Sequence, residues 1–497
     1  MSTAAARLVC IAGTLALASA SLASPPSRVR AVLLEGQTFS LPQGGSATVR
    51  SINDVFVNSR GDWIALTNQF SSTDPEMAIV NGVVVYAEGQ PIEAPTGFPT
   101  VRSWASNLPA IANNGDIAWN LSTVLGSSVE GGLRISGAIA WAFYEGDTFN
   151  DGPFLYGQWS SVPDVKINDN RQVFIVASMD VFGLGSSIDR AFVRVTLNGD
   201  GVVSESVKLL GFGDTIPGYP GETMTGGYVG ELHNAFNNAG DWIASPIFSG
   251  DAARSDLVVK NNQILLQEGS PAPIAGRNWG SLAGFVHAVD LNDAGSWVLR
   301  APMTGDTATD QIIVKDGVKF FQEGDPFPPN TARTVTSIAT MAVRLDDAGI
   351  VWWYADTNDT DTTRDQFLMR GTDGIAQEGV TPVEIPSAGG EIATLRAIDT
   401  GTSNFAVADN GKFAAFKGRL ANRPGASGDT DILALIEVRC PADFNGSGGI
   451  PDIDDIIAFF EAFNAGEDAA DANWSGGVPD IDDVLYFFEV FNAGGCD

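Results

Sequence analysis

The chain has 497 residues, 44% of them apolar, and a formal net charge of −32. This length and apolar content are enough for a folded protein with one large core or several smaller ones. The charge argues against nucleic acid and anionic membranes as partners. It is typical of a protein that meets cations, although solubility alone explains such a charge equally well.

Residues 1–23 predict a secretory signal peptide. Arg7 precedes a short apolar run from Leu8 to Leu17, and two cleavage sites of the small-residue type follow, at Ala20 and Ala23. The run is too short for a membrane span. We therefore expect an exported protein without a membrane span, either extracellular or at the cell surface.

Two cysteines, Cys440 and Cys496, remain once Cys10 leaves with the signal peptide. An even pair in an oxidising compartment predicts a disulfide, with two free thiols as the alternative. This bond would clasp both ends of the C-terminal module and stabilise it by roughly 4 kcal/mol in the chain-entropy model.

The segment 24–438 repeats itself about every 55 residues. The first mark of the repeat is an apolar strand that ends in Glu-Gly, with one degenerate copy: Glu35-Gly36, Glu88-Gly89, Glu145-Gly146, Phe212-Gly213, Glu268-Gly269, Glu323-Gly324 and Glu378-Gly379. The second mark is a turn rich in Asn, Asp and Gly between two strands, which begins at Asn58, Asn113, Asn168, Asn237, Asn292, Asp346 and Asp409. These residues tolerate the positive φ that tight hairpins need.

A third mark is a hairpin that leads into the Glu-Gly, as in 77–86, 257–266 and 312–321. Each unit thus holds four strands and no convincing helix. We expect an all-β fold, a seven-bladed β-propeller in which the N-terminal strand Val29–Glu35 completes the last blade. Such closure removes free sheet edges. The alternative is an open array of sheets.

The loops at one face of this propeller are expected to be acidic, and they suggest a glycan, another polyol, a cation or a protein as ligand. The structural alternative, which the recurrence of the motif favours, is that Gly forms each turn and Glu caps backbone donors. One asymmetric loop, 356–365, has a spacing of acids that suits calcium, although a solvated loop is the simpler interpretation. The only histidines, His233 and His287, are expected close together near the channel mouth, as wall residues, a metal pair or an acid/base pair.

The C-terminal segment 440–497 contains two copies of a twelve-residue calcium loop. Calcium prefers six to eight oxygen ligands, and the EF-hand spacing places them at loop positions 1, 3, 5, 7 and 12. The predicted ligands of the two Ca²⁺ ions are Asp443, Asn445, Ser447, Gly449 and Asp454 in the first copy, and Asp471, Asn473, Ser475, Gly477 and Asp482 in the second. A decayed, metal-free pair of loops is the alternative.

A proline, Pro451 or Pro479, precedes an apolar helical pattern in each copy, and the two helices are expected to pack face to face. No Lys or Arg follows Arg439, so the carboxylates would repel one another without a cation. The module is therefore expected to fold only with calcium.

These residues resemble a dockerin, the paired loop-helix module that binds cohesin domains. The opening from Cys440 to Gly446 and the Gly494-Gly-Cys496 near the end are similar to the GC-type dockerin tails of secreted bacterial proteins. The resemblance implies that Asp452, Ile453, Asp480 and Ile481 face a cohesin-like or cell-surface partner, in either of two orientations. Ser447 and Ser475 stand where dockerins usually have Asp, which implies weaker calcium binding.

Two functions follow as hypotheses. The first is a secreted, non-enzymatic binding or surface-assembly protein attached through its tail. The second is a polysaccharide hydrolase or lyase carried by the tail, which would need a pair of carboxylates with raised pKa values in one pocket. Because the sequence repeats its acids from unit to unit and shows no catalytic motif, the first is favoured.

Overall fold

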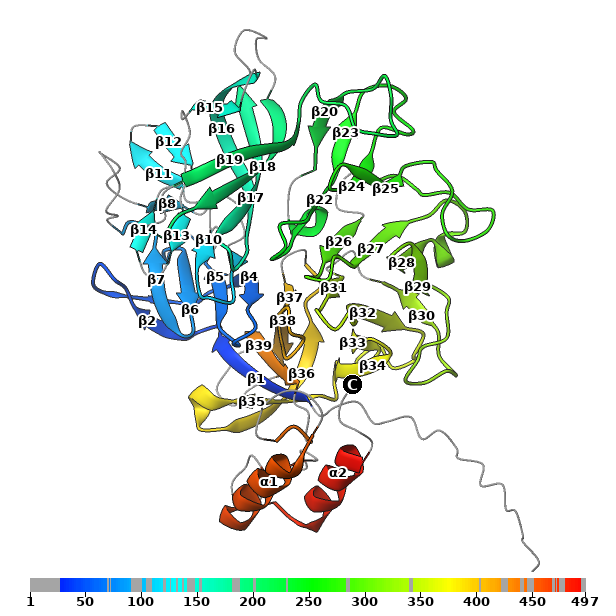
Figure 1. Ribbon diagram of the computed structural model, residues 1–497. Coiled ribbons are helices and arrows are strands. Elements are labelled where there is room, and N and C mark those ends of the chain that lie inside the picture. The colour runs from blue at the N-terminus through cyan, green and yellow to red at the C-terminus, as the bar shows by residue number, and fades with distance from the viewer. Residues whose placement is uncertain are drawn as a thin grey trace, which may run out of the picture.

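The structure is a computed structural model that describes residues 27–68, 71, 73–90, 101–103, 110–118, 122–125, 127–130, 133–135, 138–140, 148–151, 154–180, 188–199, 203–228, 231–282, 287–338, 343–401, 404–421, 428–438, 442–444, 451–466, 470, 472 and 479–492. These residues form a large all-β body and a small helical module at its side (Figure 1). The sheets of the body are arranged around a common centre, as in a propeller.

The main sheets follow one another along the chain. The first contains β4 (Ile52–Val57), β5 (Trp63–Thr67), β6 (Met77–Val80) and β7 (Val83–Ala87), and the second β9 (Ala110–Ile111), β10 (Ile117–Ala118), β13 (Leu133–Ile135) and β14 (Ala138–Ala140). The third contains β15 (Thr148–Asp151), β16 (Phe154–Ile167), β17 (Gln172–Asp180), β18 (Ile188–Leu197) and β19 (Val203–Gly211). The fourth contains β21 (Ala235–Phe236), β22 (Trp242–Ala244), β24 (Leu257–Lys260) and β25 (Gln263–Gln267).

The remaining main sheets are built in the same way. One contains β26 (Ala288–Leu291), β27 (Trp297–Pro302), β28 (Gln311–Lys315) and β29 (Val318–Gln322), and the next β30 (Val335–Ser337), β31 (Arg344–Leu345), β32 (Val351–Thr357), β33 (Gln366–Arg370) and β34 (Asp373–Gln377). The last contains β1 (Ser27–Leu34), β35 (Pro382–Ile385), β36 (Glu391–Ile398), β37 (Phe405–Val407), β38 (Phe413–Leu420) and β39 (Thr430–Val438).

Three smaller sheets accompany them. They are β2 (Thr38–Ser40) with β3 (Ser46–Thr48), β20 (Met224–Gly227) with β23 (Pro246–Phe248), and β8 (Val101–Ser103) with β11 (Ser122–Leu125) and β12 (Ser127–Glu130). The sheets thus range from two to six strands. The expectation of an all-β, propeller-like fold is confirmed, whereas the seven equal four-stranded blades that the repeat predicted are not what these sheets form.

The N-terminal strand closes the body as predicted. Strand β1 pairs antiparallel with β39 over seven residue pairs, from Ser27 opposite Val438 to Leu34 opposite Ile432. The first and the last strand of the body therefore lie in one sheet, although about 400 residues separate them in the chain. Hydrogen bonds along both strands join the ends of the repeat region and leave no free edge at that place.

The predicted hairpins are confirmed in the described repeats. Strands β6 and β7, β24 and β25, and β28 and β29 pair antiparallel across their Asn/Asp-Gly or Asn-Asn turns. Asn81, Asn261 and Asp316 each have φ of 49°, in the left-handed region that these residue types tolerate. Local turn chemistry therefore sets the register of each hairpin.

Side chains between neighbouring sheets form the core. Between β17, β18 and the sheet of β22, for example, Phe174 stacks on Phe192 and on Trp242, with ring centroids 6.1 and 6.4 Å apart. Because each sheet is buried on both faces in this way, its strands carry continuous apolar runs, such as Val351–Ala355, which is wholly buried.

Candidate functional site: the central cavity and the C-terminal module

The Asn/Asp turns form a closed ring of hydrogen bonds around one end of the central channel. In six of the seven steps, the side chain of one turn accepts the backbone N–H of the equivalent residue in another turn: Ser59 N to Asn113 (2.7 Å), Asn113 N to Asp169 (2.6 Å), Asp169 N to Asn238 (2.7 Å), Asn238 N to Asp293 (2.8 Å), Asp293 N to Asp347 (2.9 Å), and Asn410 N to Ser59 Oγ (3.1 Å). Asp347 N donates to the backbone oxygen of Asp409 (2.6 Å). Side chains from the seven turns thus tie neighbouring sheets together.

This ring gives the repeated Asn and Asp residues a role beyond the hairpin turn. Buried Asn237, for instance, donates to the carbonyl of Asn292 in the next sheet (2.8 Å), and Asn292 donates to that of Asp346 (3.0 Å). A buried carbonyl without such a donor would cost about 1–3 kcal/mol. The recurrence of the motif therefore has a structural cause at these positions.

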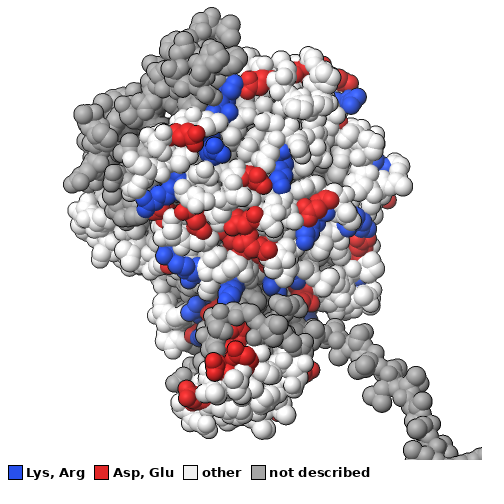
Figure 2. Space-filling model, in the orientation of Figure 1, with Lys and Arg blue, Asp and Glu red and all other residues white. Residues whose placement is uncertain are grey.

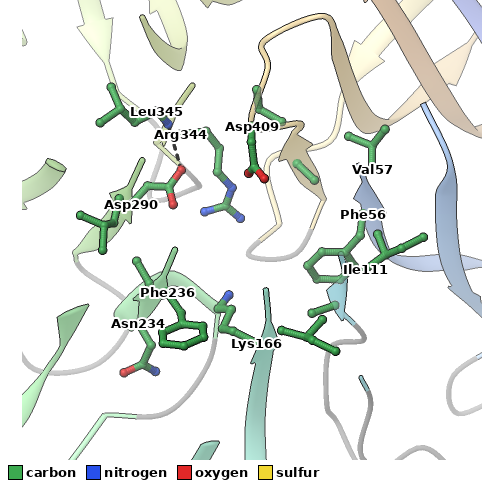
Figure 3. Close-up of a pocket in the computed structure, with 16 residues that line it drawn as sticks. Phe56, Val57, Ile111, Lys166, Asn234, Phe236, Asp290, Arg344, Leu345 and Asp409 are labelled. Atoms are coloured by element: carbon green, nitrogen blue, oxygen red, sulfur yellow. Dashed lines mark hydrogen bonds between the residues drawn. The ribbon is translucent and has the colours of Figure 1, made fainter. Parts of the chain in front are cut away.

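A cavity of about 140 Å³ lies at the centre of the body, inside this ring. It is lined by β4, β9, β16, β21, β26, β31 and β37, one strand from each main sheet. Figure 3 shows Lys166, Arg344 and Asp409 pointing into it from different sides, with Asp290 beside Arg344. Phe56, Ile111 and Phe236 supply apolar wall.

The charged side chains of the cavity are held by the backbone around them. The N–H of Leu345 donates to Asp290 Oδ2 (2.9 Å), and Arg344, only 7% exposed, donates from Nη2 to the carbonyl of Phe405 (3.2 Å). Burial raises the pKa of Asp290, while Arg344, this backbone donor and Lys166 lower it in part. The cavity is thus a preformed polar site with charges of both signs.

Asp409 lies where the cavity meets the ring. Desolvation by the surrounding protein atoms raises its pKa to about 7, with smaller contributions from the carboxylates of Asp347, Asp293 and Asp290, although Asn113 donates to its Oδ2 (2.8 Å) and opposes the shift. Its side chain is nevertheless exposed at the edge of the cavity.

Acidic side chains also gather at the centre of the visible face in Figure 2, with basic and acidic ones interspersed around them.

Asp409→Asn is expected to stabilise the protein at about pH 8 and to have little effect at about pH 4. The pKa of Asp409 is about 7 in the folded protein and about 3.9 in the unfolded chain. Its contribution to stability is therefore complete below about pH 3.9 and is lost as the pH rises through about 7, where the ionised carboxylate becomes unfavourable in the folded protein. The new amide keeps an oxygen for the Asn113 donor. Melting temperatures at both pH values would measure this, with exposed Asp429→Asn as the control; an equal shift at both would contradict it.

The two histidines lie together, as the sequence predicted, but they are buried and do not line the cavity. His233 Nδ1 is 3.1 Å from His287 Nε2, and both residues are at most 1% exposed. The carbonyl of Leu282 can only accept a hydrogen bond, so His287 Nδ1 carries a proton (3.1 Å), and its Nε2 faces Ser245 Oγ (2.8 Å). Desolvation lowers the pKa of His233 to about 4 and holds that of His287 well below its usual value. This arrangement is that of a neutral, hydrogen-bonded structural pair inside the protein.

The Glu-Gly turns are structural where their contacts are described. Gly36 and Gly324 have φ of +86°, which favours glycine. Glu323 accepts the backbone N–H groups of Gln311 and Ile338 (3.2 Å each). In the 356–365 loop, Asp361 likewise accepts the N–H of Thr363 (3.1 Å). Both contacts match the structural interpretation of these acids.

The C-terminal module contains two helices, α1 (Ile453–Ala465) and α2 (Ile481–Asn492), which lie beside the sheet of β1 and β35 in Figure 1. Phe459 and Phe487 stack with centroids 4.2 Å apart and are fully buried, so the predicted face-to-face packing is confirmed. Asp452 caps α1 by accepting the N–H of Asp454 (2.9 Å), and Asp480 accepts that of Asp482 (2.8 Å).

The partner-facing residues that the dockerin resemblance implied lie at the start of each helix. Ile453 is 63% exposed and Ile481 65%, while Asp452 and Asp480 carry the caps. Sequence reasoning missed two further exposed residues, Ile457 and Leu485, each one turn later on the same face. The spacing of four was present in both copies and would have indicated them.

Most of the predicted calcium ligands lie outside the described residues. Only Asp443, Asp454 and Asp482 are described; Asn445, Ser447, Gly449, Asp471, Asn473, Ser475 and Gly477 are not. Within the described part of the chain, no three His, Cys, Asp or Glu side chains are grouped to hold a metal ion. Calcium binding therefore stays a prediction.

Other predictions also fall outside the described ranges. The signal peptide 1–23, Cys440 and Cys496 are among the residues not described. Of the helices that are described, none has the length and apolar character needed to cross a membrane.

No protein-family model and no curated protein matches the sequence. Solved structures with some likeness in fold include puromycin hydrolase (11% identity, 82% of this chain and 60% of that chain, TM-score 0.34). Others are a subtype N11 neuraminidase-like protein of A/flat-faced bat/Peru/033/2010 (11%, 87% and 99%, 0.29) and polysaccharide lyase Uly1 (9%, 71% and 94%, 0.30). The chain spans 60% of the length of puromycin hydrolase. At these identities and TM-scores the neighbours assign no activity to this chain.

Proposed function

We propose that this chain is a secreted, non-enzymatic binding or surface-assembly protein whose propeller-like body is attached to a partner through the C-terminal two-helix module. The observation that carries the proposal is the duplicated apolar surface of the module. Ile453 and Ile457 on α1, and Ile481 and Leu485 on α2, are 50–65% exposed, at equivalent positions of the two copies. We call these four residues the docking pairs.

The docking pairs are distinct from the core of the module. Phe459 and Phe487 fill that core, so the exposed isoleucines and leucine do not serve its packing. Exposed apolar residues that cluster on one face mark interaction sites more often than single ones do. A cohesin-like domain on the cell surface is the partner that the dockerin resemblance implies, and the equivalence of the pairs suits binding in two orientations.

Several finer features belong to the same proposal. They are export by residues 1–23, two Ca²⁺ ions in the tail, the Cys440–Cys496 disulfide, and a body of seven blades. The ring of seven Asn/Asp turns and the strand from each of seven main sheets around the cavity support the last of these.

The double variant Ile453→Asp with Ile481→Asp is expected to abolish partner binding while the protein stays folded. Hot-spot apolar residues contribute about 2 kcal/mol or more each, so binding should weaken by more than about tenfold when both pairs are changed. Capture of cell-envelope proteins by the full chain in calcium, with mass-spectrometric identification of the bound partner, would measure it. Val318→Asp, at an equally exposed apolar site on the body (69%), is the matched control.

A captured cohesin-fold protein that the double variant loses and the control retains would support the proposal. Equal capture by the wild type and the double variant would overturn it. Single variants would test the two orientations, because either pair alone then suffices for binding.

One observation favours the second candidate, an extracellular polysaccharide hydrolase or lyase. Asp290 and Asp409 line the same cavity, and both have raised pKa values, as an acid/base pair requires. Asp290 is nevertheless fixed by a backbone donor and lies beside Arg344. Release of reducing or unsaturated ends from an acidic polysaccharide, abolished by Asp409→Asn, would establish this alternative.

A further inference from the structure

We propose that the central cavity binds one small monoanionic polyol, a sugar acid, whose carboxylate contacts Lys166 and Arg344 and whose hydroxyl groups donate to Asp290 and Asp409. The proposal concerns a site separate from the docking pairs and goes beyond the proposed attachment function. It rests on four observations: the asymmetry of the cavity wall, its charge, its apolar surface and its size.

The wall breaks the symmetry of the repeat. Each of the seven main sheets contributes one equivalent position near the end of the strand that lines the cavity. Phe56 occupies one of these seven positions, three hold alanine and three hold charged residues: Ala110, Ala235 and Ala406, and Lys166, Asp290 and Arg344. The small alanine side chains leave the cavity open, and the charged side chains point into it, as Figure 3 shows for Lys166, Asp290 and Arg344. A purely structural layer would repeat one residue type, as the turns themselves do.

The cavity is richer in basic side chains than the protein as a whole. The chain has only 28 basic residues and a net charge of −32, yet two basic side chains point into this small space. Arg344 is more than nine-tenths buried, and desolvating a guanidinium is costly. Its guanidinium also suits a planar carboxylate, because its donors form a fixed fork.

The mixture of charges selects among ligand classes. A metal cation or a polyamine would be repelled by Lys166 and Arg344. A simple inorganic anion would leave Asp290 and Asp409 without a matching group. A zwitterion would bring a further positive charge close to Lys166 and Arg344. Neutral hydroxyl donors next to one carboxylate satisfy both kinds of side chain.

Size and shape agree with one sugar ring. A protein cavity of about 150 Å³ is known to hold a six-membered ring, and this one measures about 140 Å³. Phe56 and Phe236 offer apolar surface to the C–H faces of such a ring. A longer oligosaccharide exceeds the cavity, so we infer recognition of a single residue or a chain end.

Isothermal titration of the full chain with D-glucuronate, D-glucose and L-serine at about pH 7 would test the proposal. We expect glucuronate to bind with a Kd of about 1 mM or tighter, and glucose and serine at least about tenfold more weakly. Lys166→Met should weaken glucuronate binding at least about tenfold. Lys412→Met, at an exposed lysine that does not line the cavity, should leave it unchanged.

Ala235→Met provides a second test that leaves every charge in place. The larger side chain fills the cavity and is expected to abolish binding, with melting temperatures confirming that each variant is folded. Glucuronate that does not bind the folded wild type, or that binds no better than glucose or serine, would overturn the proposal. So would wild-type affinity in folded Lys166→Met. None of these results bears on the docking pairs.

Discussion

Removal of calcium from the full-length protein is expected to unfold the C-terminal module and to leave the propeller-like body folded. The module contains no Lys or Arg after Arg439. The first turns of its helices carry Asp454 and Asp455, and Asp482 and Asp483. Its core is a small cluster around Phe459 and Phe487. Domains of this size rarely fold without a metal or a disulfide, and metal binding then supplies the folding free energy.

Hydrogen exchange resolved by segment would measure the effect. Amides of 453–465 and 481–492 should lose at least about 100-fold protection in a chelator, while β17 and β32 keep theirs. Asp443→Ala with Asp471→Ala should behave like the chelated protein even in calcium, because each change removes the ligand at loop position 1. Asp429→Ala, at an exposed position outside the loops, is the control. Full protection of both helices in the chelator would show that calcium is not needed.

The local elements of the fold were predictable from the sequence because their determinants are local. Asn81, Asn261 and Asp316 at hairpin turns, and glycine after each Glu, announce conformations that few other residues adopt. The helices of the tail were predictable from apolar spacing for the same reason. The closure by β1 was also predictable, because one strand precedes the first complete repeat and the last repeat lacks its fourth strand.

The cavity was not predictable, because its residues meet only after the ring closes. Lys166, Asp290 and Arg344 are separated by more than 50 residues from one another, and each lies in an ordinary-looking strand end. Their shared position, two residues before a turn, was in the sequence. The side chains that point to the axis could be recognised only once the strand lining the channel was known. The ring contacts escaped for the same reason: Asn113 reaches both Asp169 and Asp409.

The sheet count also shows the limit of repeat reasoning. The repeat gives the order of strands, but insertions change how many strands join each sheet. β35 and β36 extend the closing sheet to six strands, and β15 extends another to five. An extra strand joins a sheet only where a sheet edge is free in the folded protein, and the repeat pattern does not show which edges are free.

Leu33→Ala in the closing strand is expected to lower the free energy of unfolding of the body by roughly 2–5 kcal/mol. Leu33 is fully buried opposite Leu433 and packs in the apolar cluster that includes β4 and β5. Val29, Ala31 and Leu34 of the same strand pack in the other cluster, with β32 and β38. One short strand thus holds two neighbouring cores together.

The position of the strand adds to the cost of the cavity left at Leu33. A cavity at Leu33 loosens β1 from β39, and the whole ring depends on that pairing for closure. Since native domains are stable by only about 5–15 kcal/mol, the variant should unfold at clearly lower denaturant. Val318→Ala, at an exposed apolar strand position, should change stability by less than about 0.5 kcal/mol. Equal denaturation midpoints for the two variants would mean that closure by β1 contributes little to the stability of the body.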